Sequence, residues 1–183
     1  MSTTHRIAST PAVRTQEEIV TSAHARVWLA VLRLATGFIF LWAFLDKCFG
    51  LNYSTPPERS WLNGGTPSQG FLTSDAVIGP LKDFYASIAS PLTDWLFMLG
   101  MLGVGLAVML GAGIRVAAVA GSIIMAMMWA AEWPPTQGSS NPLVDYHVIY
   151  GLALIVIAVT LAGDTWGLGR WWGRVVHSAQ WLR

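Results

Sequence analysis

The feature that most constrains this chain is a long apolar stretch close to its N-terminal end. The residues from Val27 to Lys47 are almost all apolar, with Arg33 inside the stretch and Asp46 next to Lys47 at its end. A helix of about 20 residues, rising about 1.5 Å per residue, matches a hydrocarbon core roughly 30 Å thick. The stretch therefore predicts a transmembrane helix.

The composition also indicates an integral membrane protein in contact with a lipid bilayer. Of the 183 residues, 54% are hydrophobic and only 11% are charged, and the mean hydropathy is +0.50. A soluble domain carries roughly 25% charged residues. The net charge is only +1 and no basic cluster is present, which argues against a nucleic-acid partner.

Three further apolar stretches predict an all-α, integral membrane four-helix up-down bundle within residues 26–165. The expected spans lie at about 27–47, 92–111, 115–133 and 142–163. Residues 48–91 form an outer loop rich in Gly, Pro and Ser, and its apolar residues suggest short helices lying over the mouth of the bundle. A row of small residues at Gly103, Ala107 and Gly111 predicts a close helix contact in the second span.

The two terminal segments are expected to lie outside the bundle. Residues 1–25 are interpreted as a solvated cytoplasmic arm, whose end could begin the first helix early. Residues 166–183 place tryptophans and valines on one helical side, which predicts an amphipathic helix at the membrane interface. A docking surface for a cytosolic partner is the alternative interpretation of this tail.

The distribution of Lys and Arg predicts the orientation, because cytoplasmic loops carry more of both. The expected outer side holds Lys47, Arg59 and Lys82, and the other eight of the 11 basic residues fall on the opposite side. We therefore expect a multi-pass protein of the cell (inner or plasma) membrane with both termini in the cytoplasm.

The predicted topology brings one acid from each helix to the outer mouth: Asp46, Asp94, Glu132 and Asp145, joined by Lys47 and His147. Ionisable groups at membrane depth are costly, so they are usually paired or functional. Asp46 and Lys47 differ by about 100° around a helix and should serve different neighbours. Asp145 and His147 differ by about 200°, and we expect His147 to face inward. The alternative is that these groups are interfacial charges or helix caps.

A quinone head group would suit such a mouth, because its carbonyls take up protons on reduction and need donors beside aromatic walls. The candidate catalytic residues are Asp46, Lys47, Glu132 and His147, and the candidate residues for binding a quinone are Trp42, Trp129 and Tyr150.

No other cofactor is expected. The single cysteine, Cys48, excludes an internal disulfide or an iron–sulfur cluster held by this chain, and it is interpreted as a buried residue rather than a reactive thiol. His24 and His147 fall at opposite ends of the bundle, which disfavours haem, and no ligand set for zinc or another metal is apparent. Electron transfer would need a dissociable cofactor or one carried by a partner.

Several motifs resemble the DoxX/DoxD-type family of membrane proteins across about residues 26–172. They are Arg33-Leu-x-x-Gly-x-x-Phe-Leu-x-x-x-x-Asp-Lys47, the loop 61–67, Asp94-Trp-Leu-Phe-Met98, Asn141-Pro-Leu-Val-Asp-Tyr-His147 and Trp166-Gly-Leu-Gly-Arg-Trp-Trp172. The resemblance implies a four-spanning membrane subunit related to thiosulfate:quinone oxidoreductase, which passes electrons from thiosulfate to quinone. Some relatives look instead like scaffolds for sulfurtransferase and superoxide dismutase partners. The Asp46–Lys47 pair carries over from the family motif, whereas Glu132 and His147 rest on the expected geometry.

Three hypotheses follow from these observations. The first is a membrane subunit of a thiosulfate:quinone oxidoreductase-like system with a quinone-like ligand near the outer mouth. The second is a non-enzymatic scaffold or assembly subunit of a redox or sulfur-metabolism complex, with other membrane or soluble subunits as partners. A small-solute carrier is disfavoured, because the spans show no inverted repeat and no broken helix pair.

Overall fold

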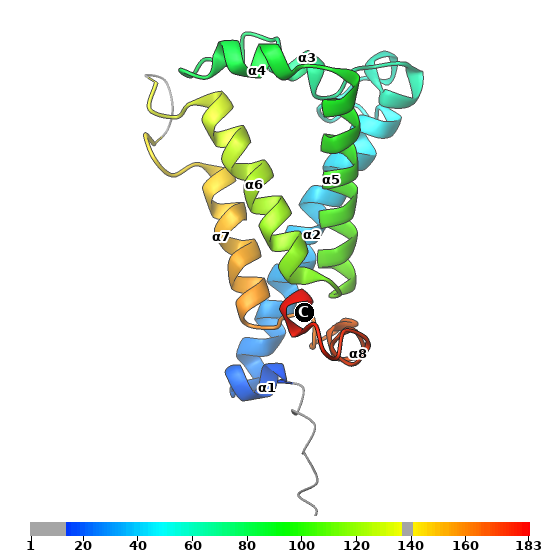
Figure 1. Ribbon diagram of the computed structural model, residues 1–183, viewed down its shortest axis with the longest axis vertical. Helices are drawn as coiled ribbons and strands as arrows, with labels where there is room; N and C mark the ends of the chain where they lie inside the picture. The colour runs from blue at the N-terminus through cyan, green and yellow to red at the C-terminus, as the bar shows by residue number, and fades with distance from the viewer. Residues whose placement is uncertain (1–13, 137–140) are drawn as a thin grey trace, which may run out of the picture.

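The protein is described by a computed structural model covering residues 14–136 and 141–183, in which all regular structure is helical. The four longest helices pack side by side along the long axis (Figure 1). They are α2 (Ala23–Phe49), α5 (Pro91–Leu110), α6 (Ile114–Glu132) and α7 (Tyr146–Val159). Contacts join α2 to α5, α5 to α6, α6 to α7 and α7 back to α2, so each helix packs against two others.

Three of these helices are long and apolar enough to cross a membrane: α2, α5 and α6. The protein is therefore a membrane protein, as the composition predicted. The helix at the fourth expected span is shorter than the range 142–163, because α7 has 14 residues, about 21 Å of helix. The Asp145 side chain caps its first turn by accepting from the Val148 amide at 3.2 Å, and the helix stops at Thr160.

The apolar core lies between the four long helices and includes Phe40, Val104, Met125 and Leu154. Helices α2 and α5 approach closely at two glycines. A β-carbon added at Gly37 would lie 2.8 Å from the Met109 backbone nitrogen, and one added at Gly105 would lie 2.7 Å from that of Leu41. The predicted contact through Gly103 is wrong, since nothing lies within 4 Å of a β-carbon there. The face of α5 that contacts α2 depends on how α5 is rotated about its own axis. The pattern of small residues did not predict that rotation.

Short helices gather at both ends of the molecule. The end that we call the loop end carries η1 (Pro57–Arg59), η2 (Trp61–Asn63), α3 (Gln69–Leu72) and α4 (Lys82–Ile88). The opposite end, the tail end, carries α1 (Gln16–Ile19), α8 (Gly169–Val175) and η3 (Gln180–Leu182). In Figure 1, α5 and α6 meet near the tail end and diverge toward the loop end, where α3 and α4 lie across the gap. We call residues 66–88, which contain these two helices, the roof.

The tail end is closed by contacts between segments far apart in sequence. The buried Arg183 guanidinium donates to both carboxylate oxygens of Asp164 at 2.8 Å. Asp164 also accepts from the backbone N–H of Gln16 at 2.9 Å, and Thr165 donates to the Gln16 side chain at 2.6 Å. The predicted single amphipathic helix over 166–183 is therefore wrong, because the tail turns back on itself after α8. Residue 16 is buried rather than part of a solvated arm, and residues 1–13 lie outside the described part of the chain.

Candidate functional site

Asp46 holds the chain that follows α2. Its buried carboxylate accepts from the backbone N–H of Tyr53 at 3.1 Å and of Ser54 at 3.0 Å, and from the Ser54 hydroxyl at 2.6 Å. It forms no ion pair with Lys47 among the described residues. The angular argument from the sequence separated the two side chains correctly, and Asp46 acts as a loop anchor.

Asp94 anchors the roof in the same way. It lies in the first turn of α5, and its Oδ1 accepts from the Ser68 N–H at 2.7 Å, the Ser68 hydroxyl at 2.9 Å and the Gln69 N–H at 3.0 Å. The Gln69 side-chain amide donates to the other oxygen. Both carboxylates are thus saturated with donors, as buried charges require.

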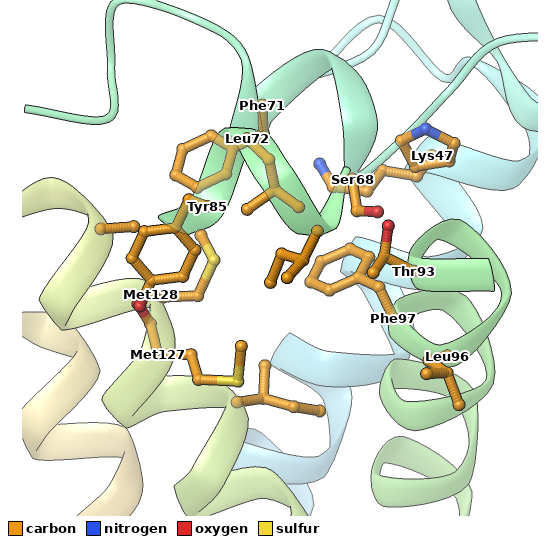
Figure 2. A pocket seen from close by; sticks show the side chains of 14 residues that line it. Lys47, Ser68, Phe71, Leu72, Tyr85, Thr93, Leu96, Phe97, Met127 and Met128 are labelled. Atoms are coloured by element: carbon orange, nitrogen blue, oxygen red, sulfur yellow. The ribbon is translucent and has the colours of Figure 1, made fainter. Parts of the chain in front are cut away.

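Among the described residues, Lys47 does not hydrogen-bond to the loop that Asp46 holds. Instead it lines a cavity of about 280 Å³ beneath the roof (Figure 2). Helix α5 contributes Thr93, Leu96 and Phe97 to the wall, α6 contributes Ile124, Met127, Met128 and Ala131, and the roof contributes Pro67, Ser68, Phe71, Leu72, Tyr85 and Ile88. The lining is almost entirely carbon and sulfur. The exceptions are the ammonium group of Lys47 and the hydroxyl-bearing side chains of Ser68, Thr93 and Tyr85.

A second cavity of about 500 Å³ lies on the other side of Lys47, within the loop end. Its wall is about half polar and includes Glu58, Arg59 and Asn63. The two cavities share Lys47, Pro67 and Phe71. Lys47 therefore lies where an apolar chamber meets a polar one, and within the described chain no hydrogen bond or ion pair occupies its ammonium group.

Tyr85 joins the roof to α6. Its ring is buried with Val77 and Ala131, and its hydroxyl donates to the backbone carbonyl of Met127 at 2.8 Å. Burial raises the pKa of the Tyr85 phenol above its ordinary value, so the group remains a protonated donor throughout the physiological pH range. This bond fixes one wall of the apolar cavity.

Glu132 and His147 lie in a separate cluster between the end of α6 and the start of α7. His147 Nδ1 is 2.8 Å from a carboxylate oxygen of Asp145, and the Tyr146 hydroxyl lies 3.2 Å and 3.3 Å from the two Glu132 oxygens. We expected only one of Asp145 and His147 to face inward, but the two side chains contact each other. Asp145 is the N-cap with extended backbone, so helical angles do not apply to it.

One potential ligand atom from each of Glu132, Asp145 and His147 lies within 4.8 Å of the other two. Such spacing could hold a divalent cation, but hydrogen bonds inside the cluster already account for the arrangement. It does not by itself indicate a metal site.

The three aromatic candidates also lie away from both cavities. Trp129 donates its indole N–H to the Leu143 carbonyl at 3.0 Å, and the Tyr150 ring lies 5.9 Å from that of Tyr146. Trp42 packs edge-on against Tyr53 with ring centroids 5.1 Å apart. Of the seven predicted site residues, only Lys47 lines either cavity.

Sequence reasoning did not single out the residues that form the apolar cavity with Lys47. The available signal was the row of apolar residues in the loop, including Phe71, Tyr85 and Ile88, which indicated a cover over the bundle. Their partners on α6 occur at positions 124, 127, 128 and 131, a helical i, i+3, i+4, i+7 spacing.

Comparisons with protein-family models, with curated proteins and with solved structures found no match for this chain.

Proposed function

We propose that this protein is a membrane subunit of a redox system and holds a quinone-like ligand in the cavity beneath the roof. One observation carries the proposal: in a membrane protein, Lys47 is the charged residue in the wall of a largely apolar cavity, and among the described residues no hydrogen bond or ion pair occupies its ammonium group. Ligand pockets commonly combine an apolar lining with a few polar groups that fix orientation. A relation to thiosulfate:quinone oxidoreductase remains part of the proposal and rests on the sequence resemblance.

The chemistry of a quinone head group suits the residues around Lys47. A quinone carbonyl is a hydrogen-bond acceptor, and the Lys47 ammonium is a donor in the cavity wall. The flat ring would lie against Phe71 and Phe97, which supply the aromatic surface. Neither Glu132 nor His147 is assigned to ligand contact in this proposal, because both belong to the α6–α7 cluster.

We further propose that the protein lies in the cell membrane with both termini in the cytoplasm. At the loop end the basic residues are Lys47, Arg59 and Lys82, whereas Arg26, Arg115, Arg170 and Arg174 belong to segments at the tail end. This asymmetry supports a cytoplasmic tail end. The polar cavity beside Lys47 would then face the outside.

The proposal is tested by measuring quinone binding to the detergent-purified protein, with wild type, Lys47→Ala and Lys82→Ala compared. A hydrogen bond from a charged donor contributes about 1.5–3 kcal/mol, so Lys47→Ala should weaken binding roughly 10- to 100-fold. Lys82 lies at the same end, lines neither cavity and, among the described residues, pairs with the exposed Asp75 at 3.7 Å, so Lys82→Ala should bind as wild type does.

Two results would overturn the proposal. One is a folded wild-type protein that binds no quinone, which would favour the scaffold hypothesis. The other is equal affinity of wild type and Lys47→Ala.

A further inference from the structure

We infer that the ligand enters the apolar cavity sideways from the bilayer, between α5 and α6, and is therefore an amphiphile with a long apolar tail. Its head stops at Lys47 and its tail leaves the cavity between Leu96 and Met127. This inference rests on the proposed function and specifies the class of quinone that the site takes.

Two diverging helices supply opposite walls of the apolar cavity. Helices α5 and α6 diverge toward the loop end (Figure 1), and each presents one face to the space between them. Thr93, Leu96 and Phe97 have the i, i+3, i+4 spacing of a single helix face, as do Ile124, Met127 and Met128. The two faces form opposite walls of the cavity.

Two wall residues also belong to the outer surface of the protein. Leu96 is 61% exposed and Met127 is 42% exposed, although both line the cavity. They lie on two helices that are long and apolar enough to span a membrane. Their exposed surface therefore faces lipid, and the cavity reaches the lipid-facing surface between them.

The roof is tied down by hydrogen bonds that involve backbone groups. Asp94 holds the amides of Ser68 and Gln69, Tyr85 donates to the Met127 carbonyl, and the Ile78 amide donates to the Ala131 carbonyl at 3.1 Å. Opening the roof would break several of these bonds together. At the side, the cavity wall between the helices includes the Leu96 and Met127 side chains, and methionine is an adaptable side chain.

The volume of the apolar cavity limits how much of a ligand it can hold. The apolar cavity measures about 280 Å³, just below the roughly 300–1,000 Å³ of ordinary ligand pockets. A ring and the first part of a tail fill such a space, and a longer tail must continue outside it. The gap between α5 and α6 leads that tail into the hydrocarbon region, where it remains solvated by lipid.

The experiment compares a tail-bearing quinone with its tail-less analogue in proteoliposomes, using four tryptophan variants. Leu96→Trp and Met127→Trp narrow the inferred entry. Leu99→Trp and Ile123→Trp are matched controls, because both side chains are exposed on the same helices but line neither cavity. All four positions face lipid, so equal melting temperatures should confirm that the variants fold.

We expect Leu96→Trp and Met127→Trp to slow uptake of the tail-bearing quinone at least about fivefold, while the two controls match wild type. A tail-bearing quinone with a photoreactive group in its tail should also cross-link to residues 96 and 127 in wild type, and not to 99 or 123. If neither quinone binds to wild type, the proposed function itself fails. If both quinones bind equally well and all four variants behave alike, sideways entry is wrong while the proposed function stands.

Discussion

Arg33 is a fully buried cation whose partners are backbone carbonyls rather than an acid. Its Nη1 donates to Val108 at 2.7 Å, its Nη2 to Trp166 at 2.9 Å and its Nε to Ala162 at 3.2 Å, and further bonds reach Met109 and Thr165. The last carbonyls of a helix lack intrahelical partners and carry partial negative charge. Arg33 therefore caps the end of α5 and the turn after α7 at once, which the planar fork of a guanidinium allows.

Replacing Arg33 with methionine should strongly destabilise the protein, because carbonyls at the end of α5 and in the turn after α7 would lose the guanidinium donors. We expect a cost of about 3 kcal/mol or more, since bonds from charged donors contribute about 1.5–3 kcal/mol each. The measurement is the apparent Tm in detergent. Arg115→Met is the control, because Arg115 is exposed and makes one bond of 3.3 Å to the Gln180 carbonyl. An unchanged Tm for Arg33→Met would show that water replaces the guanidinium.

Among the elements, the roof is a small unit tied by hydrogen bonds to two long helices. Asp94 binds it to α5, and Tyr85 and Ile78 bind it to α6. Asp46 holds the segment that leads from α2 toward it. The roof therefore fixes the spacing of α5 and α6 at the loop end, and with it the shape of the apolar cavity.

Removal of the Asp94 carboxylate should loosen the roof without unfolding the bundle. In Asp94→Ala the amides of Ser68 and Gln69 lose their acceptor, at a local cost of about 1–3 kcal/mol. Hydrogen exchange at residues 68–72 should accelerate roughly 10- to 100-fold, while exchange within α7 stays as in wild type. Asp75→Ala is the matched control, because that exposed acid only pairs with Lys82. Unaltered exchange at 68–72 would show that the roof is held by apolar packing alone.

Helices marked by a regular apolar pattern could be predicted from the sequence. Contacts that depend on the rotation of one helix relative to another could not. The apolar stretches located α2, α5 and α6 to within a few residues. Helical angles also separated Asp46 from Lys47, because both lie in one helix. The predicted site residues fall in separate places, with Lys47 at the cavities and Glu132 and His147 in the α6–α7 cluster, because nothing in a single helix states how α6 is turned relative to α2. The amides that Asp94 binds lie 25 and 26 residues away, in a loop without periodicity.

The molecule as a whole has an exposed apolar middle between two ends that carry exposed aromatic residues. The middle of the long helices exposes residues such as Leu99, Val119, Ile123 and Leu152. Exposed aromatic residues occur in the segments at both ends: Trp28, Trp166, Trp171 and Trp181 at the tail end, and Tyr53, Trp95 and Tyr146 at the loop end. Tryptophan and tyrosine are enriched at the two membrane–water interfaces. The surface therefore supports a membrane position with both ends in contact with water.

The proposed orientation predicts which end reacts with a reagent that cannot cross the membrane. Cys48 is the only cysteine and is buried, so a Cys48→Ala background carries no thiol. In that background, Glu58→Cys at the loop end should react with an impermeant maleimide in intact cells. Ser178→Cys at the tail end should react only after permeabilisation. Both native side chains are exposed, which makes the two positions comparable. The reverse pattern would overturn the orientation.

The Arg33 bonds also constrain the order in which the protein is made. Arg33 belongs to the first long helix, but its acceptors lie 75 to 133 residues later in the chain. While α2 enters the membrane during synthesis, its guanidinium has none of these partners and must stay hydrated at the interface. Gln16 likewise precedes its partner Asp164 by 148 residues. The tail end can therefore close only after the acceptors that follow α7 have been synthesised.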